Sequence, residues 1–260
     1  MNILDTIITQ KKIEVAARKK SKTVKQLEDG PFFKNETLSF REYLLRKDKT
    51  GIIAEFKRKS PSKGIINDNV TVHEVTKGYT QYGASGLSVL TDEKFFGGSL
   101  DDLLAATINE IPILRKDFII DEYQLIESKA FGAEIILLIA ACLSKDEVKN
   151  LSSFAKNIGL NVLLEIHDES ELNHICDSVD VVGVNNRDLK TFAVDINRSV
   201  ELSKVIPGSV LKISESGIDD PASIRLLREY GYKGFLIGEK FMKHPDPTIA
   251  FAQFVEQLNN

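Results

Sequence analysis

The sequence contains only two cysteines, no tryptophan and no long hydrophobic run. Cys142 and Cys176 are too few for a disulfide framework, and no group of cysteines and histidines has the spacing of zinc ligands. The longest apolar run, residues 135–143, is far shorter than the roughly 18 residues of a membrane-spanning helix. The lack of tryptophan removes its fluorescence as a background signal. We therefore exclude a disulfide-rich secreted protein and a membrane-embedded one, and we expect no metal.

Positive charge is not in excess either. The chain has 34 lysines and arginines against 38 acidic residues, a net charge of −4 and a pI near 5.7. This balance argues against nucleic acid as a partner, so any anion site must be local. Asp5 and Thr6 interrupt the only apolar stretch at the N-terminus, and no small-residue cleavage site follows, which is unlike a signal peptide. We expect a cytoplasmic protein that does not bind membranes.

Short apolar runs recur from residue 52 onward and predict eight β-strands. The runs are IIAEF (52–56), GLSVLT (86–91), IPILRKDF (111–118), EIILLIA (134–140), NVLLEIH (161–167), VVGVNN (181–186), VLKISES (210–216) and GFLIG (234–238). They are nearly continuous in Val, Ile and Leu, which is typical of parallel strands that are covered on both faces.

Helical patterns separate several of these runs, and each of them stops at a glycine. The patterns cover residues 68–82, 122–131, 145–158 and 222–230, followed by Gly83, Gly132, Gly159 and Gly231. Repeated βα units with short connections favour a closed (β/α)8 TIM barrel over an open doubly wound sheet. A dinucleotide fold is further disfavoured because no G-x-G-x-x-G motif follows the first strand.

The first fifty residues form a separate region of the sequence. Leu4, Ile7, Ile8 and Val15 fall on one side of a helix, and a basic stretch follows at residues 18–25. Such a helix suits a membrane surface or an acidic partner, but we favour docking on the barrel with the lysines in solvent. A 260-residue chain allows one domain or two. We predict a single barrel domain, residues 1–260, in which residues 1–50, including a short helix near residues 39–46, are an N-terminal helical extension.

Polar residues gather at the predicted carboxyl ends of the strands, where TIM barrels carry their working residues. They are Glu55, Lys57, Arg115, Lys116, Asp117, Glu165, His167, Asn185, Arg187, Glu215, Ser216, Gly217 and Gly238. Charged residues inside apolar strands need a partner or a solvated cavity, because desolvation is costly. Convergence of two lysines and two glutamates on one rim suggests an acid/base set around an anionic substrate.

Individual residues allow simpler interpretations. Glu55 and Lys57 are two apart and form a plausible pair on one strand face. Lys116 lies beside Asp117, but neighbouring strand residues face opposite sides, so that pairing is a poor explanation. His167 and Asp168 resemble strand-exit and helix-capping residues, whereas Arg58 and Lys59 resemble a solvated flank.

Two glycine-containing segments point to a phosphate. Ser216 and Gly217 follow the seventh strand and Gly238 follows the eighth, where barrels commonly bind phosphate through backbone N–H groups. The loop at residues 60–64 follows the first strand and is placed to close over the same ligand.

Successive blocks of the chain resemble indole-3-glycerol phosphate synthase. They are IIAEFKRKSPSKG (52–64), LSVLTDEKFFGGSL (87–100), PILRKDFIIDEYQ (112–124), LLEIH (163–167), GVNNRDLKTF (183–192), SESGI (214–218) and FLIGEKFM (235–242). The resemblance spans essentially the whole chain. It implies ring closure, decarboxylation and dehydration of 1-(2-carboxyphenylamino)-1-deoxyribulose 5-phosphate in tryptophan biosynthesis, with no cofactor and no metal.

The resemblance also implies residue roles. Lys116 is the general acid, Glu165 the base of the late steps, Lys57 the partner of the substrate carboxylate, and Glu55 holds a lysine in place. Binding positions are Ser60, Phe96, Phe118, Asn185, Arg187, Glu215, Ser216, Gly217 and Gly238. Among these, Phe96 and Phe118 form the aromatic walls, whereas Ser60, Gly217 and Gly238 contact phosphate. Lys240 departs from the expected smaller residue. We expect a phosphorylated small-molecule substrate and a monomer.

Three alternatives remain open. A phosphoribosylanthranilate isomerase-like barrel would use an Asp/Cys pair at strand ends, where neither cysteine sits convincingly. A Schiff-base aldolase would act through Lys116. A non-catalytic barrel that binds a phosphorylated metabolite would be expected to lack a lysine or glutamate from the rim, and none is missing.

Overall fold

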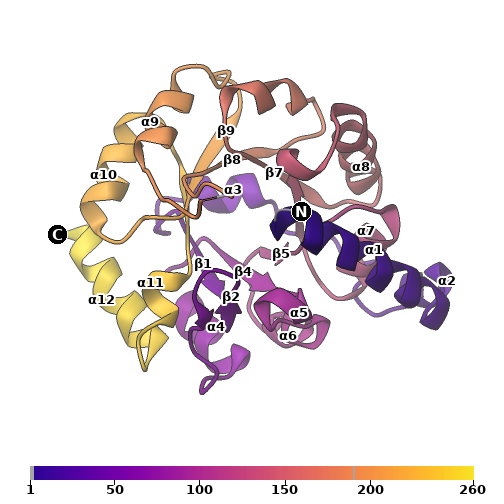
Figure 1. The fold of residues 1–260 in the computed structure, drawn as a ribbon. Coiled ribbons are helices and arrows are strands. Elements are labelled where there is room, and N and C mark those ends of the chain that lie inside the picture. Colours follow the sequence, from indigo (N-terminus) through magenta and orange to yellow (C-terminus); the bar gives the residue numbers. More distant parts are fainter. Residues whose placement is uncertain (1–2, 190) are drawn as a thin grey trace.

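The computed structural model describes residues 3–189 and 191–260 and contains a closed barrel of parallel strands (Figure 1). The strands are β1 (Ile52–Phe56), β4 (Gly86–Leu90), β5 (Ile113–Lys116), β6 (Ile135–Ile139), β7 (Asn161–Ile166), β8 (Val181–Asn185), β9 (Leu211–Glu215) and β10 (Gly234–Ile237). Each strand pairs with the next along the chain, and β10 closes on β1 with Ile53 opposite Leu236. The predicted strands and the TIM-barrel fold are confirmed.

Helices surround the barrel, and four of them, α4, α7, α8 and α10, lie in the ranges predicted from the sequence. They are α4 (Val72–Gln81), α5 (Glu93–Phe96), α6 (Leu100–Ala106), α7 (Glu122–Ala130), α8 (Lys145–Asn157), α9 (Asn197–Ser203), α10 (Pro221–Glu229), α11 (Glu239–Met242) and α12 (Pro247–Asn259). Short 3-10 turns η1 (Ala140–Cys142) and η2 (Glu169–His174) follow β6 and β7. Ser144 begins α8 by accepting a hydrogen bond from Glu147 N. Gly159 follows that helix with φ 81°, a left-handed conformation that favours glycine.

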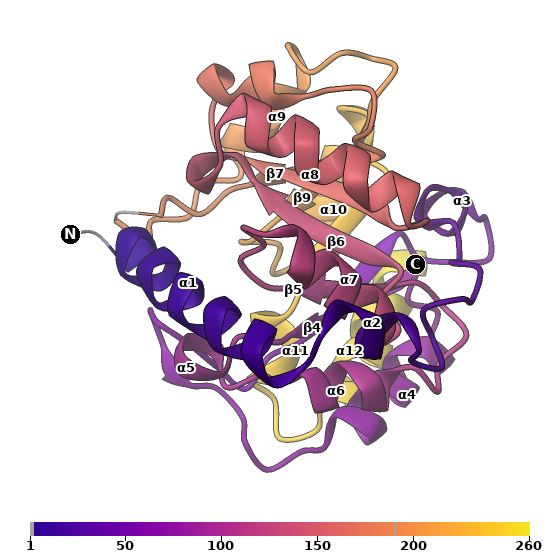
Figure 2. The ribbon, with the colours of Figure 1, turned by 90° about the vertical axis from the view of Figure 1, so that its right-hand side faces the viewer.

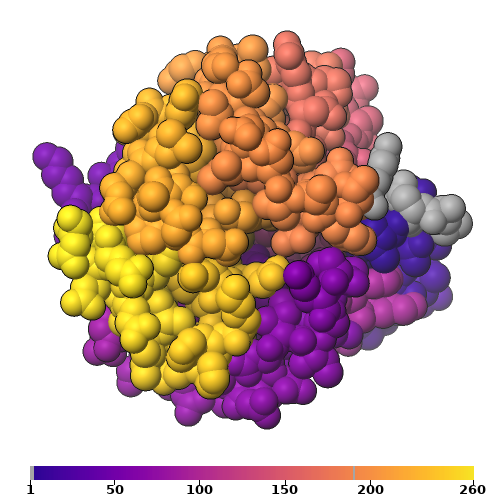
Figure 3. Space-filling model, turned by 60° about the vertical axis from the view of Figure 1, so that its left-hand side comes forward, coloured from indigo at the N-terminus to yellow at the C-terminus, as the bar shows by residue number. Residues whose placement is uncertain are grey.

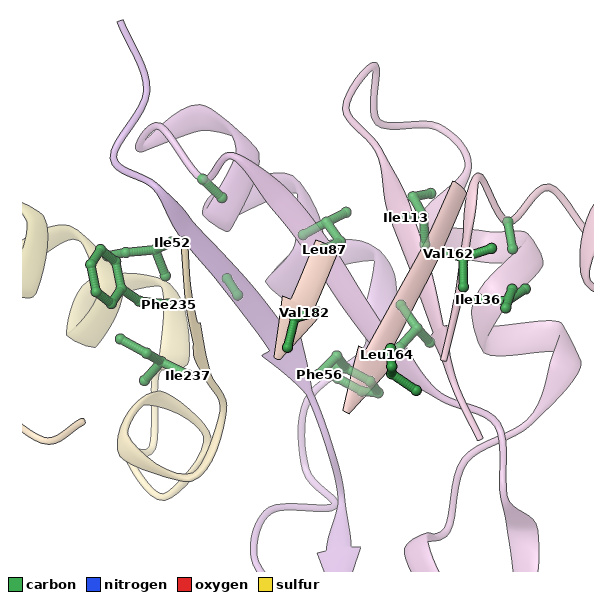
Figure 4. Close-up of a cluster of buried hydrophobic side chains, with 14 of the residues drawn as sticks. Ile52, Phe56, Leu87, Ile113, Ile136, Val162, Leu164, Val182, Phe235 and Ile237 are labelled. Atoms are coloured by element: carbon green, nitrogen blue, oxygen red, sulfur yellow. The ribbon is translucent and has the colours of Figure 1, made fainter. Parts of the chain in front are cut away.

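Strand residues alternate between two hydrophobic clusters. One set lies between strands and outer helices and includes Ile52, Phe56 and Leu87 (Figure 4). The other set fills the barrel interior and includes Ile53 and Leu163. Because successive strand side chains point to opposite faces, this alternation decides which charged residues enter the barrel at the carboxyl ends of the strands.

The N-terminal extension contributes to both ends of the barrel. In Figure 2, α1 (Ile3–Ser21) lies on one side of the barrel and α3 (Phe40–Leu45) on the opposite side, with α2 (Val24–Glu28) between them in sequence. Phe40 and Leu44 of α3 belong to the cluster that fills the barrel interior, at the end of the barrel opposite α1. Ile7 and Val15 of α1 are buried, so the predicted docking of this helix on the barrel is confirmed.

A buried lysine fastens α1 to the barrel. The Lys11 ammonium lies 2.8 Å from Asp92 and 2.8 Å from Asp117, and none of the three side chains is exposed. Asp117 also pairs with Arg115 at 3.0 Å. Burial alone would lower the pKa of Lys11, but Asp117 and Asp92 raise it above its ordinary value. The lysine is therefore a permanent cation between two buried carboxylates.

We expect Lys11→Met to destabilise the fold strongly. Removing one partner of a buried ion cluster leaves uncompensated charge and typically costs about 3–5 kcal/mol. For a chain of this size that corresponds to a fall in Tm of roughly 6–20 °C. Differential scanning calorimetry measures it, and Lys12→Met on the exposed face of the same helix is the matched control. Equal melting temperatures for the two variants would contradict the role of Lys11.

Candidate active site

Two adjoining cavities open at the carboxyl ends of the strands, with volumes of about 320 Å³ and 160 Å³. They share the side chains of Glu55, Lys57, Arg187 and Ser216. Figure 3 shows a hollow where purple, orange and yellow parts of the chain meet. The residues predicted from sequence to form the site all line one cavity or the other: Glu55, Lys57, Ser60, Phe96, Lys116, Phe118, Glu165, Asn185, Arg187, Glu215, Ser216, Gly217 and Gly238.

Strand alternation brings the charged residues into these cavities. On β5, Leu114 belongs to the interior cluster, so Lys116 two residues later also points inward. Arg115 and Asp117 face outward, where they pair with each other. The sequence-based expectation that Lys116 and Asp117 lie on opposite faces is confirmed.

Lys116 stands between two buried carboxylates. Its ammonium lies 3.4 Å from Glu165 Oε2 and 3.7 Å from Glu215 Oε2. Burial alone would lower the pKa of Lys116, but Glu165, Glu215 and Glu55 together raise it above its ordinary value. Lys116 is therefore a charged ammonium at neutral pH, able to donate a proton or to stabilise negative charge.

The two carboxylates differ in their protonation. Burial alone would raise the pKa of Glu165, but the Lys116 ammonium and His167 lower it below its ordinary value. Burial and the neighbouring Glu165 carboxylate raise the pKa of Glu215 to about 8. At neutral pH the site thus holds an ionised Glu165 and a protonated Glu215, which is the separation expected of an acid/base pair.

A second ion pair lies on β1. The Lys57 ammonium is 2.6 Å from Glu55 Oε1, and Ser88 donates to the other oxygen of Glu55 at 3.1 Å. Burial would raise the pKa of Glu55, but Lys57 and Lys116 lower it. A Cβ at Gly238 would lie 2.6 Å from Glu55 Oε1, so glycine there leaves room for this carboxylate. Glu55 thus fixes Lys57 at the junction of the two cavities.

The larger cavity has a polar, glycine-containing wall. Ser216 and Gly217 have φ values of 68° and 73°, so the backbone turns sharply after β9. Lys63 and Lys240 also line this cavity, together with Gly238. In an acidic protein this concentration of cations and backbone groups suits an anion. Lys240, the one departure from the expected sequence, lies on the cavity wall.

The smaller cavity is largely apolar. The rings of Phe96 and Phe118 pack against each other at an angle of 39°, with centroids 6.1 Å apart. Ile3, Leu4 and Ile7 of α1 complete the wall. Sequence reasoning identified the apolar stripe of α1 but missed its place in the site, because periodicity shows which face of a helix is buried and not what it is buried against.

The loop after β1 forms a small hairpin, β2 (Lys59–Ser60) and β3 (Gly64–Ile65), held by a strong ion pair. Arg58 makes a bidentate contact with Asp102 at 2.5 and 2.8 Å. The prediction that Arg58 is a solvated flank is therefore wrong, because its partner on α6 is distant in sequence.

Glu239 was also missed by sequence reasoning. It lies 3.3 Å from Arg187 and 3.8 Å from Lys63, and so connects the hairpin loop to the loop after β8 across the cavity mouth. No sequence motif singled out this residue.

Within 3–189 and 191–260, no three His, Cys, Asp or Glu side chains are grouped to hold a metal ion. No helix in the described part of the chain has the length and apolarity to cross a membrane.

The fold and the site together define a TIM-barrel protein with an acid/base cluster beside a site for an anion. Comparison with known proteins narrows this class. The indole-3-glycerol phosphate synthase family profile matches residues 4–254. An indole-3-glycerol phosphate synthase from Bacteroides thetaiotaomicron is 45% identical over 99% of this chain and 99% of its own length. One from Acinetobacter baumannii is 42% identical over 98% and 96%. The chain belongs to the indole-3-glycerol phosphate synthase family, whose members are carboxy-lyases of tryptophan biosynthesis.

Solved structures support the fold alone. The tryptophan synthase alpha subunit from Legionella pneumophila superposes with a TM-score of 0.61 at 14% identity, covering 84% of this chain and 96% of that one. The 3-hexulose-6-phosphate synthase from Salmonella typhimurium gives 0.61 at 12% identity, covering 80% and 98%.

Proposed function

We propose that the protein converts 1-(2-carboxyphenylamino)-1-deoxyribulose 5-phosphate to indole-3-glycerol phosphate at this rim. The observation that carries the proposal is the position of Lys116 between Glu165 and Glu215, in an aromatic pocket that adjoins a cationic, glycine-lined cavity. The substrate has the matching parts: an aromatic ring, a carboxylate and a phosphate.

Substrate placement follows from the two cavities. The carboxyphenyl ring packs against Phe96 and Phe118 in the smaller cavity, where aromatic surface is removed from water. Lys57, at the junction, pairs with the carboxylate while Glu55 holds its ammonium. The phosphate lies in the larger cavity against Gly217 and Gly238. Asn185, Arg187 and Glu215 orient the chain between them, and Ser60 and Ser216 contribute hydroxyls.

The chemistry then runs through Lys116 and Glu165. As the aromatic carbon attacks the ketose carbonyl, Lys116 donates a proton to the oxygen and offsets its developing negative charge. Loss of CO₂ from the ring carbon that formed the new bond restores aromaticity. The final dehydration removes a proton and expels the hydroxyl, and ionised Glu165 is the base for that proton.

The charge of Lys116 disfavours the Schiff-base alternative. A lysine must be a neutral amine to attack a carbonyl, and the carboxylates around Lys116 raise its pKa above the ordinary value. Borohydride trapping of a substrate adduct on Lys116 would support the aldolase instead.

The test is turnover of the substrate by the purified protein in the presence of EDTA, followed by the fluorescence of the indole product. The chain has no tryptophan, so the background is low. A rise in fluorescence supports the proposal. No signal, or a signal only after adding a divalent metal, contradicts it.

The phosphate position gives a separate prediction. Gly217→Ala should raise the KM at least about tenfold while changing kcat less. Alanine is strained at φ 73°, and its Cβ would overlap Val194, so the backbone amide must move. A lost hydrogen bond to a charged group costs about 1.5–3 kcal/mol, or roughly one to two powers of ten. Gly208→Ala, where a Cβ meets open space, is the control. An unchanged KM for Gly217→Ala would contradict the placement of the phosphate against Gly217.

The expected monomeric state stays a prediction. The predicted cytoplasmic location remains a prediction, supported by the biosynthetic role of the family.

A further inference from the structure

His167 lies between two carboxylates, behind the proposed base. Its Nε2 is 3.3 Å from Glu165 Oε1, and its Nδ1 is 3.4 Å from Glu171 Oε2. The backbone N–H of His167 donates to the same oxygen of Glu171 at 2.6 Å, which fixes the strand end against η2. The ring is almost completely buried. Neither ring nitrogen makes a well-aligned hydrogen bond, so the two carboxylates act on the buried ring as nearby negative charges, and these favour the imidazolium.

The two acidic residues beside Lys116 share most of their surroundings, although the Asn185 side chain also hydrogen-bonds Glu165 and the Glu55 carboxylate also acts on Glu215. Both are buried, and their oxygens lie at 3.4 and 3.7 Å from the same ammonium. One cation between two buried carboxylates does not stabilise both in the ionised form, so one of them retains a proton. Only Glu165 has a second cation beside it. Glu215 Oε1 is buried, has no hydrogen-bond partner and lies over the backbone of Gly183.

We propose that His167 is a positioning residue that makes Glu165, rather than Glu215, the ionised carboxylate beside Lys116. Glu171 holds the imidazolium in place from the other side. This inference deepens the proposed function and rests on it, because it explains which of the two acidic residues acts as the base.

The ionisable groups around the ring agree with this assignment. They are Glu165 on β7, Glu171 and Asp168 at η2, Cys142 at η1 and, beyond Glu165, Lys116 on β5. Burial alone would lower the pKa of His167, but Glu165 and Glu171 raise it to about 9. Burial raises the pKa of the Cys142 thiol, so Cys142 adds no charge at neutral pH. The imidazolium therefore persists at the pH at which Glu215 retains its proton.

The experiment is the pH profile of kcat for His167→Gln. Without the imidazolium, the proton shared by the two acidic residues spends more time on Glu165. We expect kcat to fall at least about tenfold near pH 6.5, which corresponds to a rise of one unit in the pKa of Glu165. Near pH 9, where both acidic residues are ionised, kcat should recover to within about threefold of the unmodified protein. KM should change little. Glu171→Gln should shift the profile in the same direction by less.

His174→Gln is the matched control. His174 is also on η2, but its ring nitrogens contact the backbone carbonyls of Glu171 and Leu143 and not a carboxylate among the described residues. It should leave the pH profile unchanged. A uniform loss of kcat at every pH in His167→Gln, or a profile unchanged in both His167→Gln and Glu171→Gln, would overturn the proposal and indicate a structural role only.

A second measurement separates this inference from the proposed function. Titration of the chain labelled with ¹³C at the glutamate carboxyls reports ionisation without turnover, and Glu165→Gln and Glu215→Gln assign the two signals. The unmodified protein should show Glu165 ionised and Glu215 protonated at pH 6.5, and His167→Gln should move proton occupancy toward Glu165. If the unmodified protein shows Glu215 ionised and Glu165 protonated at pH 6.5, the inference is overturned even if turnover is observed. If it shows Glu165 ionised and Glu215 protonated, the inference is supported even if turnover is not observed.

Discussion

Lys116→Met should lower kcat by at least about a thousandfold while the substrate still binds. General acid catalysis by a positioned side chain contributes roughly 10²–10⁴, and stabilisation of a developing oxyanion contributes a comparable factor. Methionine has a similar length but neither a proton nor a charge. The ring, carboxylate and phosphate contacts remain, because Phe96, Phe118, Lys57 and Gly217 are unchanged. The loss should therefore appear in kcat and not in the dissociation constant.

Stopped-flow or steady-state fluorescence gives kcat, and isothermal titration calorimetry gives the binding constant. Lys77→Met, an exposed lysine on α4, is the control for the substitution itself. The melting temperature must be recorded as well, since Glu165 and Glu215 lose their shared cation and will retain an additional proton. A kcat within tenfold of that of the unmodified protein would show that Lys116 is not the general acid.

Much of this architecture follows from local patterns in the sequence. The continuous apolar strands and the glycines after the helices predict a barrel, since each strand and each helix end is specified by neighbouring residues. Once the barrel is assumed, the two-residue period of a strand places Lys116 inward and Asp117 outward. The rim residues could therefore be predicted without coordinates.

Contacts between distant segments could not be predicted in this way. Lys11 resembles any other lysine of a basic helix, yet it is buried against Asp92 and Asp117. Arg58 lies between two lysines in sequence, and its partner Asp102 is on α6, 44 residues further along the chain. Such pairs depend on how whole elements pack, which hydrophobic periodicity leaves open. The unequal protonation of Glu165 and Glu215 also depends on contacts between distant segments, because burial and neighbouring charges determine the two pKa values.

Glu165→Gln should slow turnover by about two to four powers of ten. The amide keeps the size and the hydrogen bonding of the side chain but has no basic oxygen for the proton lost in dehydration. Because ring closure and decarboxylation precede that proton transfer, we expect the intermediate before dehydration to accumulate in a single turnover. Rapid quench of the reaction and mass spectrometry detect it as a species that has lost CO₂ and still contains the water. A rate close to that of the unmodified protein would show that Glu165 is not the base.

The combination of Glu165→Gln with His167→Gln makes this assignment stricter. If His167 acts on catalysis only by keeping Glu165 ionised, its removal has nothing further to change once residue 165 is an amide. The double variant should then turn over at the rate of Glu165→Gln alone, with the same pH profile. Two residues that act independently would instead give additive losses in activation free energy. Additive losses would mean that His167 affects catalysis independently of Glu165. The non-additive result would show that His167 acts through the ionisation of Glu165.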